Sequence, residues 1–275
     1  MRLVTLAGPA GATVAAVREG DAFHALLDAG GVPYADLGAA LAGGFDGASP
    51  EALGDGYHVV RPVLSPAAIV CVGINYGAHI QEMGRETPTS PTLFLKLPQA
   101  LLDPGDDVAM PPESGKVDYE GELVAVVGRG GRRIPRDEAL DHVAGVTLMN
   151  DVTMRDFQYR SIQWFAGKSW RASTPVGPEV VTLDELDGLE ARELTTTVNG
   201  ELRQKAAIGD LVFDIPSLVA DISQVIELAP GDLIATGTPG GVGHGMDPPG
   251  YLSAGDVVEV SVDGVGTLRT TFVSG

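Results

Sequence analysis

Cysteine, aromatic residues and basic residues are all scarce in this chain of 275 residues. Its single cysteine, Cys71, excludes a disulfide within the chain and is typical of a protein of the reducing cytoplasm. Cys71 lies in the short apolar run of residues 67–73, where no nearby histidine or basic residue would activate a thiolate. We therefore expect a buried and unreactive thiol here, not a catalytic nucleophile.

Basic residues number 18 against 37 acidic ones, which gives a net charge of −19. This surplus of negative charge disfavours nucleic acid and anionic membrane surfaces as partners. The sequence also lacks an apolar stretch of membrane-spanning length, and Gly8 and Pro9 break the apolar run near its start. We expect a cytoplasmic protein. If its substrate is an anion, the binding site must be made locally positive, for example by a metal ion and a lysine.

The most informative segment is 118–128, in which Glu120 and Glu122 precede an apolar run. On a β-strand these two carboxylates would point to the same face. Neighbouring like charges repel each other unless a cation lies between them. Oxygen ligands select a hard ion, so the pair predicts a site for Mg²⁺, Mn²⁺ or Ca²⁺. The alternative is that both glutamates line the solvated face of an edge strand.

A third carboxylate is expected to complete this metal site, and Asp151 is the candidate. It ends the apolar run of residues 143–150, which predicts a second buried strand. A strand end is where a parallel neighbour can deliver a ligand into a shared cleft.

The chain divides at prolines near residue 65 into a small N-terminal β-rich domain, residues 1–65, and a larger domain, residues 66–275. In the first domain we predict strands at 2–6 and 13–18 and helices at 21–29 and 34–42. In the second we predict strands at 69–73, 92–96, 122–128, 143–150, 194–199, 232–236, 257–262 and 266–273. The helices expected there are 75–83, 135–141, 154–161 and 215–228. The fold class is thus mixed, β-rich α/β with peripheral helices.

His79 and Glu82 stand three residues apart on the first of these predicted helices. That spacing puts both on one helix face, where the carboxylate can orient and charge-stabilise an imidazole that acts as a general base. The same spacing is also common on solvated helices without any function.

A series of short motifs follows in order along the second domain: Asn75-Tyr76 with His79 and Glu82, Phe94-Leu95-Lys96, Glu120-Gly121-Glu122, Asn150-Asp151-Val152-Thr153 with Arg155-Asp156, Gly167-Lys168-Ser169-Trp170, Val198-Asn199-Gly200, and residues 231–239. Together they resemble the fumarylacetoacetate hydrolase family, and in particular its acylpyruvase-like and 2-hydroxyhepta-2,4-diene-1,7-dioate isomerase-like branch. The resemblance covers residues 66–275. It implies a rolled mixed β-sheet, a homodimer, a bound Mg²⁺ or Mn²⁺, and a small anionic keto-acid substrate.

The resemblance also assigns roles to individual residues. It implies Glu120, Glu122 and Asp151 as metal ligands, in agreement with the strand argument. His79 and Glu82 match a catalytic dyad in a lid over the substrate. Lys168 matches a pocket lysine with catalytic and substrate-binding roles. The other matches are the substrate-binding residues Gln158, Thr238 and Lys96. Lys168 has a reason of its own, because a cation beside the metal would hold a substrate carboxylate or a developing oxyanion.

The function implied first is a divalent-metal-dependent hydrolase of the carbon–carbon bond in acylpyruvate, fumarylpyruvate or 2,4-diketo acids. His79, polarised by Glu82, would activate the attacking water. One alternative is an oxaloacetate decarboxylase or a keto–enol isomerase on the same metal site, which needs no water. A third hypothesis is a non-catalytic, ligand-binding dimer.

Overall fold

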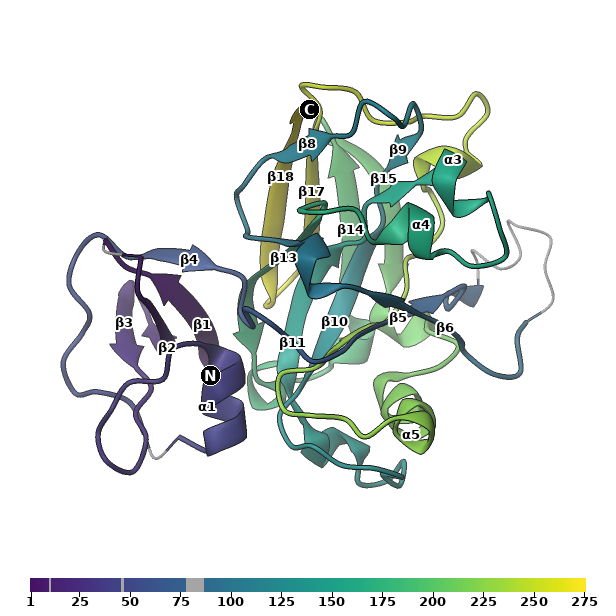
Figure 1. Cartoon of the computed structure of the whole chain (residues 1–275). Helices are drawn as coiled ribbons and strands as arrows, with labels where there is room; N and C mark the ends of the chain where they lie inside the picture. The colour runs from purple at the N-terminus through teal and green to yellow at the C-terminus, as the bar shows by residue number, and fades with distance from the viewer. Residues whose placement is uncertain (10, 46, 78–86) are drawn as a thin grey trace.

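The computed structural model describes residues 1–9, 11–45, 47–77 and 87–275, and most of the regular structure in them is β-sheet (Figure 1). The larger sheet has eleven strands. Its main path runs β3 (Ala22–Ala25), β2 (Thr13–Glu19), β1 (Arg2–Ala7), β13 (Thr174–Val181), β11 (Val143–Asn150), β10 (Gly121–Val127), β16 (Leu233–Ala235), β5 (Ile69–Gly73) and β6 (Thr92–Lys96). Off this path, β4 (His58–Val60) pairs with β1, and β7 (Leu101–Leu102) pairs with β13.

A second sheet of five strands packs across the first. Its order is β15 (Glu201–Ala207), β14 (Glu193–Val198), β17 (Val257–Val262), β18 (Gly266–Ser274) and β8 (Val108–Met110). A short ladder joins β9 (Val117–Asp118) to β12 (Thr153–Met154). Parallel pairs, such as β16 with β5 and β18 with β8, occur among mostly antiparallel ones, so the sheets are mixed as expected.

Helices are short and lie at the periphery of the sheets (Figure 1). In the described part of the chain the α-helices are α1 (Leu37–Gly43), α3 (Arg155–Gln158), α4 (Phe165–Lys168) and α5 (Ile215–Val225). The 3₁₀ turns are η1 (Pro98–Ala100), η2 (Ala139–His142), η3 (Leu183–Glu185), η4 (Leu189–Ala191), η5 (Ile208–Asp210) and η6 (Gly243–Gly245). Asp214 caps helix α5, and its carboxylate accepts a hydrogen bond from the Ser217 amide. Leu218 and Ile222 lie on the buried face of the helix. Among the described helices, none is long and apolar enough to cross a membrane.

Strand β10 is buried on both faces, which explains its unbroken apolar run. Leu123 and Ala125 belong to the large cluster between the two sheets and α5. Val124 and Val126 point the opposite way, into a second cluster that α1 covers. Glu122 precedes Val124 by two residues and therefore emerges on the α1 side of the sheet, at the end of that cluster.

Most predicted strands of the second domain are confirmed, and β11 and β17 have the predicted bounds. The helix predicted at 21–29 is wrong, since residues 22–25 form β3, which pairs with β2. Strands β13 and β15 were not predicted. β13 contains two prolines, Pro175 and Pro178, which are typical of breaks in a strand. Strand β1 pairs with β13, so the larger sheet runs on into the N-terminal residues, and the division at residue 65 stays a prediction.

Candidate active site

Three buried carboxylates meet where β10 begins and β11 ends. Residues Gly121 and Asn150 are directly paired across the antiparallel ladder, which places Glu120 and Glu122 beside Asp151. The three residues can each offer a carboxylate oxygen within 4.8 Å of the others. The prediction that Asp151 arrives from a parallel strand is wrong. An antiparallel pair achieves the same result because the start of one strand lies against the end of the other.

The edge-strand interpretation of the two glutamates is also wrong. β10 is a central strand, and the residues Glu120 and Glu122 are 7% and 1% exposed. Gly121 separates them because its α-carbon faces the second sheet, where an added Cβ would come within 2.2 Å of the Thr196 hydroxyl. In the sequence Glu-Gly-Glu, the two glutamates therefore direct their carboxylates toward the site, while the glycine allows β14 to pack closely on the opposite face.

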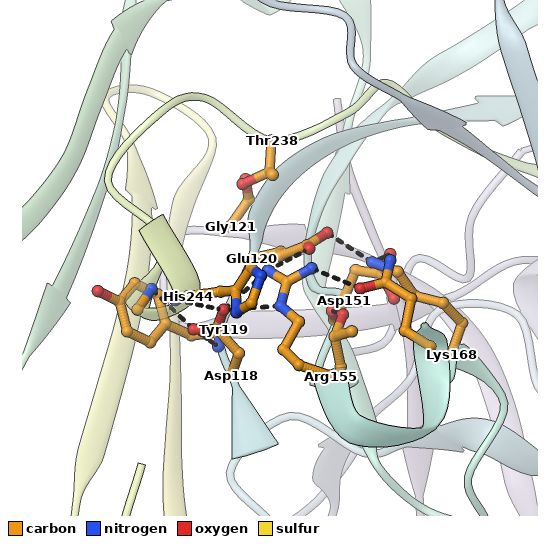
Figure 2. Close-up of polar contacts among 12 residues, drawn as sticks. Asp118, Tyr119, Glu120, Gly121, Asp151, Arg155, Lys168, Thr238 and His244 are labelled. Atoms are coloured by element: carbon orange, nitrogen blue, oxygen red, sulfur yellow. Dashed lines mark hydrogen bonds and ion pairs between the residues drawn. The ribbon is translucent and has the colours of Figure 1, made fainter. Parts of the chain in front are cut away.

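Three buried cations of the described residues surround the carboxylates. Figure 2 labels two of them, Lys168 and Arg155. Lys168 Nζ lies 2.6 Å from Glu120 Oε2 and 2.8 Å from Asp151 Oδ2. Lys96 Nζ lies 2.5 Å from the other Asp151 oxygen. The Arg155 guanidinium pairs with Glu120 Oε1 at 2.7 Å and with Asp118 Oδ2 at 2.8 Å.

The pKa values in this cluster follow from burial and these charges. Burial, reinforced by Asp151 and Glu120, raises the pKa of Glu122 well above its ordinary value. Burial alone would raise the pKa of Asp151 as well, but the ammonium groups of Lys168 and Lys96 hold this pKa below the ordinary value of an aspartate. Burial alone would lower the pKa of Lys168, yet Asp151 and Glu120 raise it. Lys168 is therefore a cation at neutral pH.

The residues fit a hard divalent metal ion. Glu120, Glu122 and Asp151 provide only oxygen donors, close enough together to share one ion. Among the residues that the structure describes, they make with Asp118 four carboxylates against the three cations Lys96, Arg155 and Lys168, a formal balance of −1 when all are ionised. A divalent ion would change that balance to +1. A metal would thus make the site attractive to an anionic substrate, despite the net charge of the chain.

A small cavity of about 50 Å³ opens onto Glu120 and Glu122. One part of its lining is polar and consists of Glu120, Glu122, Arg155, Gln158, Lys168 and Thr238. The other part is apolar and aromatic and consists of Val72, Ile74, Phe94, Tyr159 and Trp164, with Gly73 between them. The cavity thus has a charged end at Glu120, Arg155 and Lys168 and an apolar end at Phe94 and Trp164.

The predicted substrate-binding residues occupy different places. Gln158 lines the cavity and accepts a hydrogen bond from Arg155 at 2.9 Å. Thr238 also lines it, but its hydroxyl donates to the Gly121 carbonyl and accepts from the Gln204 amide. Lys96 lies behind Asp151, and the residues that line the cavity do not include it. His79 and Glu82 lie outside the described residues, so the dyad stays a prediction.

Arg155 and Asp118 are functional candidates to which the sequence argument assigned no role. Asp118 accepts hydrogen bonds from the backbone amides of Tyr119, Gly243 and His244 as well as from Arg155, and it holds the guanidinium against Glu120 (Figure 2). Asp118 lies two residues before Glu120, and Arg155 lies four residues after Asp151. This nearness to predicted metal ligands was the only sign in the sequence that the two residues could belong to the site. Their pairing depends on the loop at residues 241–245, which no local pattern connects to them.

A mixed-sheet fold with a buried carboxylate triad and an adjoining buried lysine defines an enzyme whose acidic site could hold a metal ion. The chain belongs to the fumarylacetoacetate hydrolase family: residues 68–273 match the family described as fumarylacetoacetate (FAA) hydrolase C-terminal. The resemblance found in the motifs is thereby confirmed.

Relatives with different activities resemble this chain. The oxaloacetate tautomerase YisK of Bacillus subtilis is 43% identical over 211 residues, 75% of this chain and 70% of that protein. The 2-hydroxyhepta-2,4-diene-1,7-dioate isomerase of Mycobacterium marinum matches in structure with a TM-score of 0.77 and 33% identity, over 100% of this chain and 98% of that one. The fumarylpyruvate hydrolase of Pseudomonas aeruginosa, solved with Mn²⁺ and pyruvate, matches with a TM-score of 0.70 and 33% identity, over 79% and 92%.

Proposed function

We propose that this protein is a divalent-metal-dependent enzyme that interconverts the keto and enol forms of a small 2-oxo dicarboxylate, with oxaloacetate as the first candidate. The observation that carries the proposal is the buried ammonium of Lys168 in direct contact with two of the three triad carboxylates, at the wall of a small cavity. The similarity to an oxaloacetate tautomerase supports this choice over the hydrolase expected first.

Keto–enol interconversion moves one proton between C3 of the substrate and the oxygen on C2, and negative charge develops on that oxygen. Mg²⁺ or Mn²⁺ on Glu120, Glu122 and Asp151 would supply Lewis-acid stabilisation of this charge. Lys168 presents a fixed ammonium to the same region and can donate a hydrogen bond to the oxyanion. It needs no reorganisation, because Glu120 and Asp151 already hold its Nζ in place.

The second carboxylate of the substrate requires another cation. Arg155 lines the cavity with its guanidinium held by Asp118, and Gln158 lies beside it. A planar guanidinium is suited to binding a carboxylate. We assign Arg155 and Gln158 to that end of the substrate and Lys168 to the reacting end.

Hydrolysis of an acylpyruvate is the second candidate, favoured by the similarity to a fumarylpyruvate hydrolase. It uses the same oxyanion stabilisation but also requires a base that activates water, a role predicted for His79 with Glu82. A panel of oxaloacetate, fumarylpyruvate and other acylpyruvates, each assayed with Mg²⁺ and with Mn²⁺, tests the proposal. Faster turnover of an acylpyruvate than of oxaloacetate would favour the hydrolase instead.

A further inference from the structure

The apolar wall of the cavity is built around Trp164, a residue without a role so far. Trp164 immediately precedes α4, and Lys168 ends the same helix four residues later. Residues at this spacing share one helix face. The Gly167 amide donates to the Trp164 carbonyl at 2.9 Å, which fixes this turn. Trp164 and Lys168 thus approach the cavity from a common rigid element, and both line it.

Two strands hold the indole of Trp164 in place. On β6, the Phe94 ring meets it edge to face, with ring centroids 5.5 Å apart and planes inclined at 68°. On β5, Gly73 leaves the space for the indole, because a Cβ at Gly73 would lie 2.3 Å from Trp164 Cζ3. Gly73 does not have a positive φ, so close approach of the ring explains this glycine better than backbone conformation does.

The same arrangement connects the apolar wall to the reacting end of the cavity. Phe94 and Lys96 alternate along β6 and point to the same face of the strand. Lys168 Nζ lies 5.2 Å from the centre of the Phe94 ring, within range of a cation–π interaction. The alkyl chain of a 2-oxo acid held at Lys168 can therefore extend toward Phe94 and Trp164, on the apolar side of the cavity away from Arg155 and Gln158.

We propose that Trp164 limits the length of the substrate, so that the site accepts short 2-oxo acids and excludes those with longer chains. This inference rests on the proposed function, since it takes the 2-oxo acid end of the ligand to lie at the triad and Lys168. The indole packs against Gly73 and lines the cavity of about 50 Å³. Removal of the indole extends the cavity along its apolar side.

Calorimetric titration of the Mn²⁺-loaded protein with pyruvate, 2-oxobutyrate and 2-oxooctanoate tests the inference by binding alone. Wild-type protein should bind the two short acids and bind 2-oxooctanoate much more weakly. Trp164→Ala should improve the affinity for 2-oxooctanoate by about tenfold or more, because methylene groups gain an apolar pocket, while pyruvate affinity changes little. Trp164→Phe should give an intermediate result.

Two further variants make the test specific. Phe165→Ala removes an aromatic ring that is 52% exposed at the next position, and it should leave the chain-length profile unchanged. Gly73→Ala should displace the indole and weaken binding of all three acids, and combination with Trp164→Ala should relieve that defect. Unchanged Mn²⁺ affinity in each variant verifies that the site is folded.

Two results would overturn the inference in distinguishable ways. If wild-type protein binds pyruvate but Trp164→Ala and Trp164→Phe keep the wild-type chain-length profile, the length limit is not set by Trp164 and the proposed function stands. If the Mn²⁺-loaded wild-type protein binds none of the three acids, the inference fails, and a titration with oxaloacetate on the same preparation shows whether the proposed function fails with it.

Discussion

Lys168 and Asp151 form an ion pair in which both side chains are almost fully buried, with Lys168 Nζ 2.8 Å from Asp151 Oδ2. The second oxygen of Asp151 is taken by Lys96, so one carboxylate balances two ammonium groups. A buried carboxylate with such partners stays ionised, and a buried lysine with such partners stays protonated. The pair therefore keeps the proposed metal ligand Asp151 and the proposed anion-binding group of Lys168 ionised in a place from which water is largely excluded.

Loss of a triad carboxylate should weaken metal binding. Glu122→Gln and Asp151→Asn each remove an anionic oxygen donor, and we expect the Mn²⁺ affinity to fall at least about tenfold, with loss of activity. Isothermal titration with Mn²⁺ measures it. Glu227→Gln, at an exposed position, is the matched control. Equal affinities in wild type and both triad variants would remove the metal assignment.

Metal binding should depend on pH through Glu122. Its raised pKa means that a proton competes with the metal at a higher pH than for an ordinary glutamate. The apparent Mn²⁺ affinity should consequently rise with pH above 4.5, the ordinary value, until Glu122 is fully ionised. Titrations at several pH values in wild type and Glu122→Gln measure this, and the variant should lose that part of the dependence. The same pH profile in both proteins would assign the competing proton to another group.

Lys168 should matter for turnover more than for metal binding. We expect Lys168→Ala to lower kcat by about 10²-fold or more, the usual effect of losing a donor to an oxyanion. Its Mn²⁺ affinity should not fall, because the variant removes a positive charge from beside the ligands. Steady-state kinetics and metal titration of the same preparation separate the two effects. Lys205→Ala, at a half-exposed lysine on β15, is the control and should resemble wild type in both measurements.

His79 distinguishes the two candidate reactions, since only hydrolysis requires an activated water. We expect His79→Ala to lose acylpyruvate hydrolysis by about 10²–10⁴-fold, the typical contribution of a general base. Keto–enol interconversion of oxaloacetate should fall much less. Assays of both substrates with one enzyme preparation give the comparison. Intact hydrolysis in this variant would mean that another group activates the water.

The carboxylate triad could be predicted from the sequence because its signal is local. Glu120 and Glu122 are two residues apart, and Asp151 follows a strong apolar strand. The cations that stabilise this site were harder to place. Arg155 depends on Asp118 and on a loop more than eighty residues further along the chain, a relationship that only the folded structure creates.

The fold was predictable to a similar extent. Strands with regular apolar patterns, such as β11 and β17, were found within one residue of their bounds. β3 was mistaken for a helix because its four residues are too few to show a period, and pairing with β2 decides its conformation. β13 was hidden by its prolines, which the sheet accommodates beside a register shift. In both cases tertiary pairing outweighs the local preference.

The oligomeric state is a prediction from the family resemblance. We expect a homodimer, with a mass in solution of twice the 28.4 kDa of the chain. Light scattering coupled to size-exclusion chromatography at micromolar concentration measures it. A mass of one chain would contradict the prediction and leave the proposed chemistry of the site unaffected.

The most direct test of the account is the rate at which the Mn²⁺- or Mg²⁺-loaded protein converts enol oxaloacetate to the keto form, followed by loss of the enol absorbance. We predict a strong acceleration over the uncatalysed reaction that disappears in Glu122→Gln and is greatly reduced in Lys168→Ala. An acceleration that is equal in wild type and both variants, or none in the metal-loaded wild type, would contradict the assignment of keto–enol chemistry to this site.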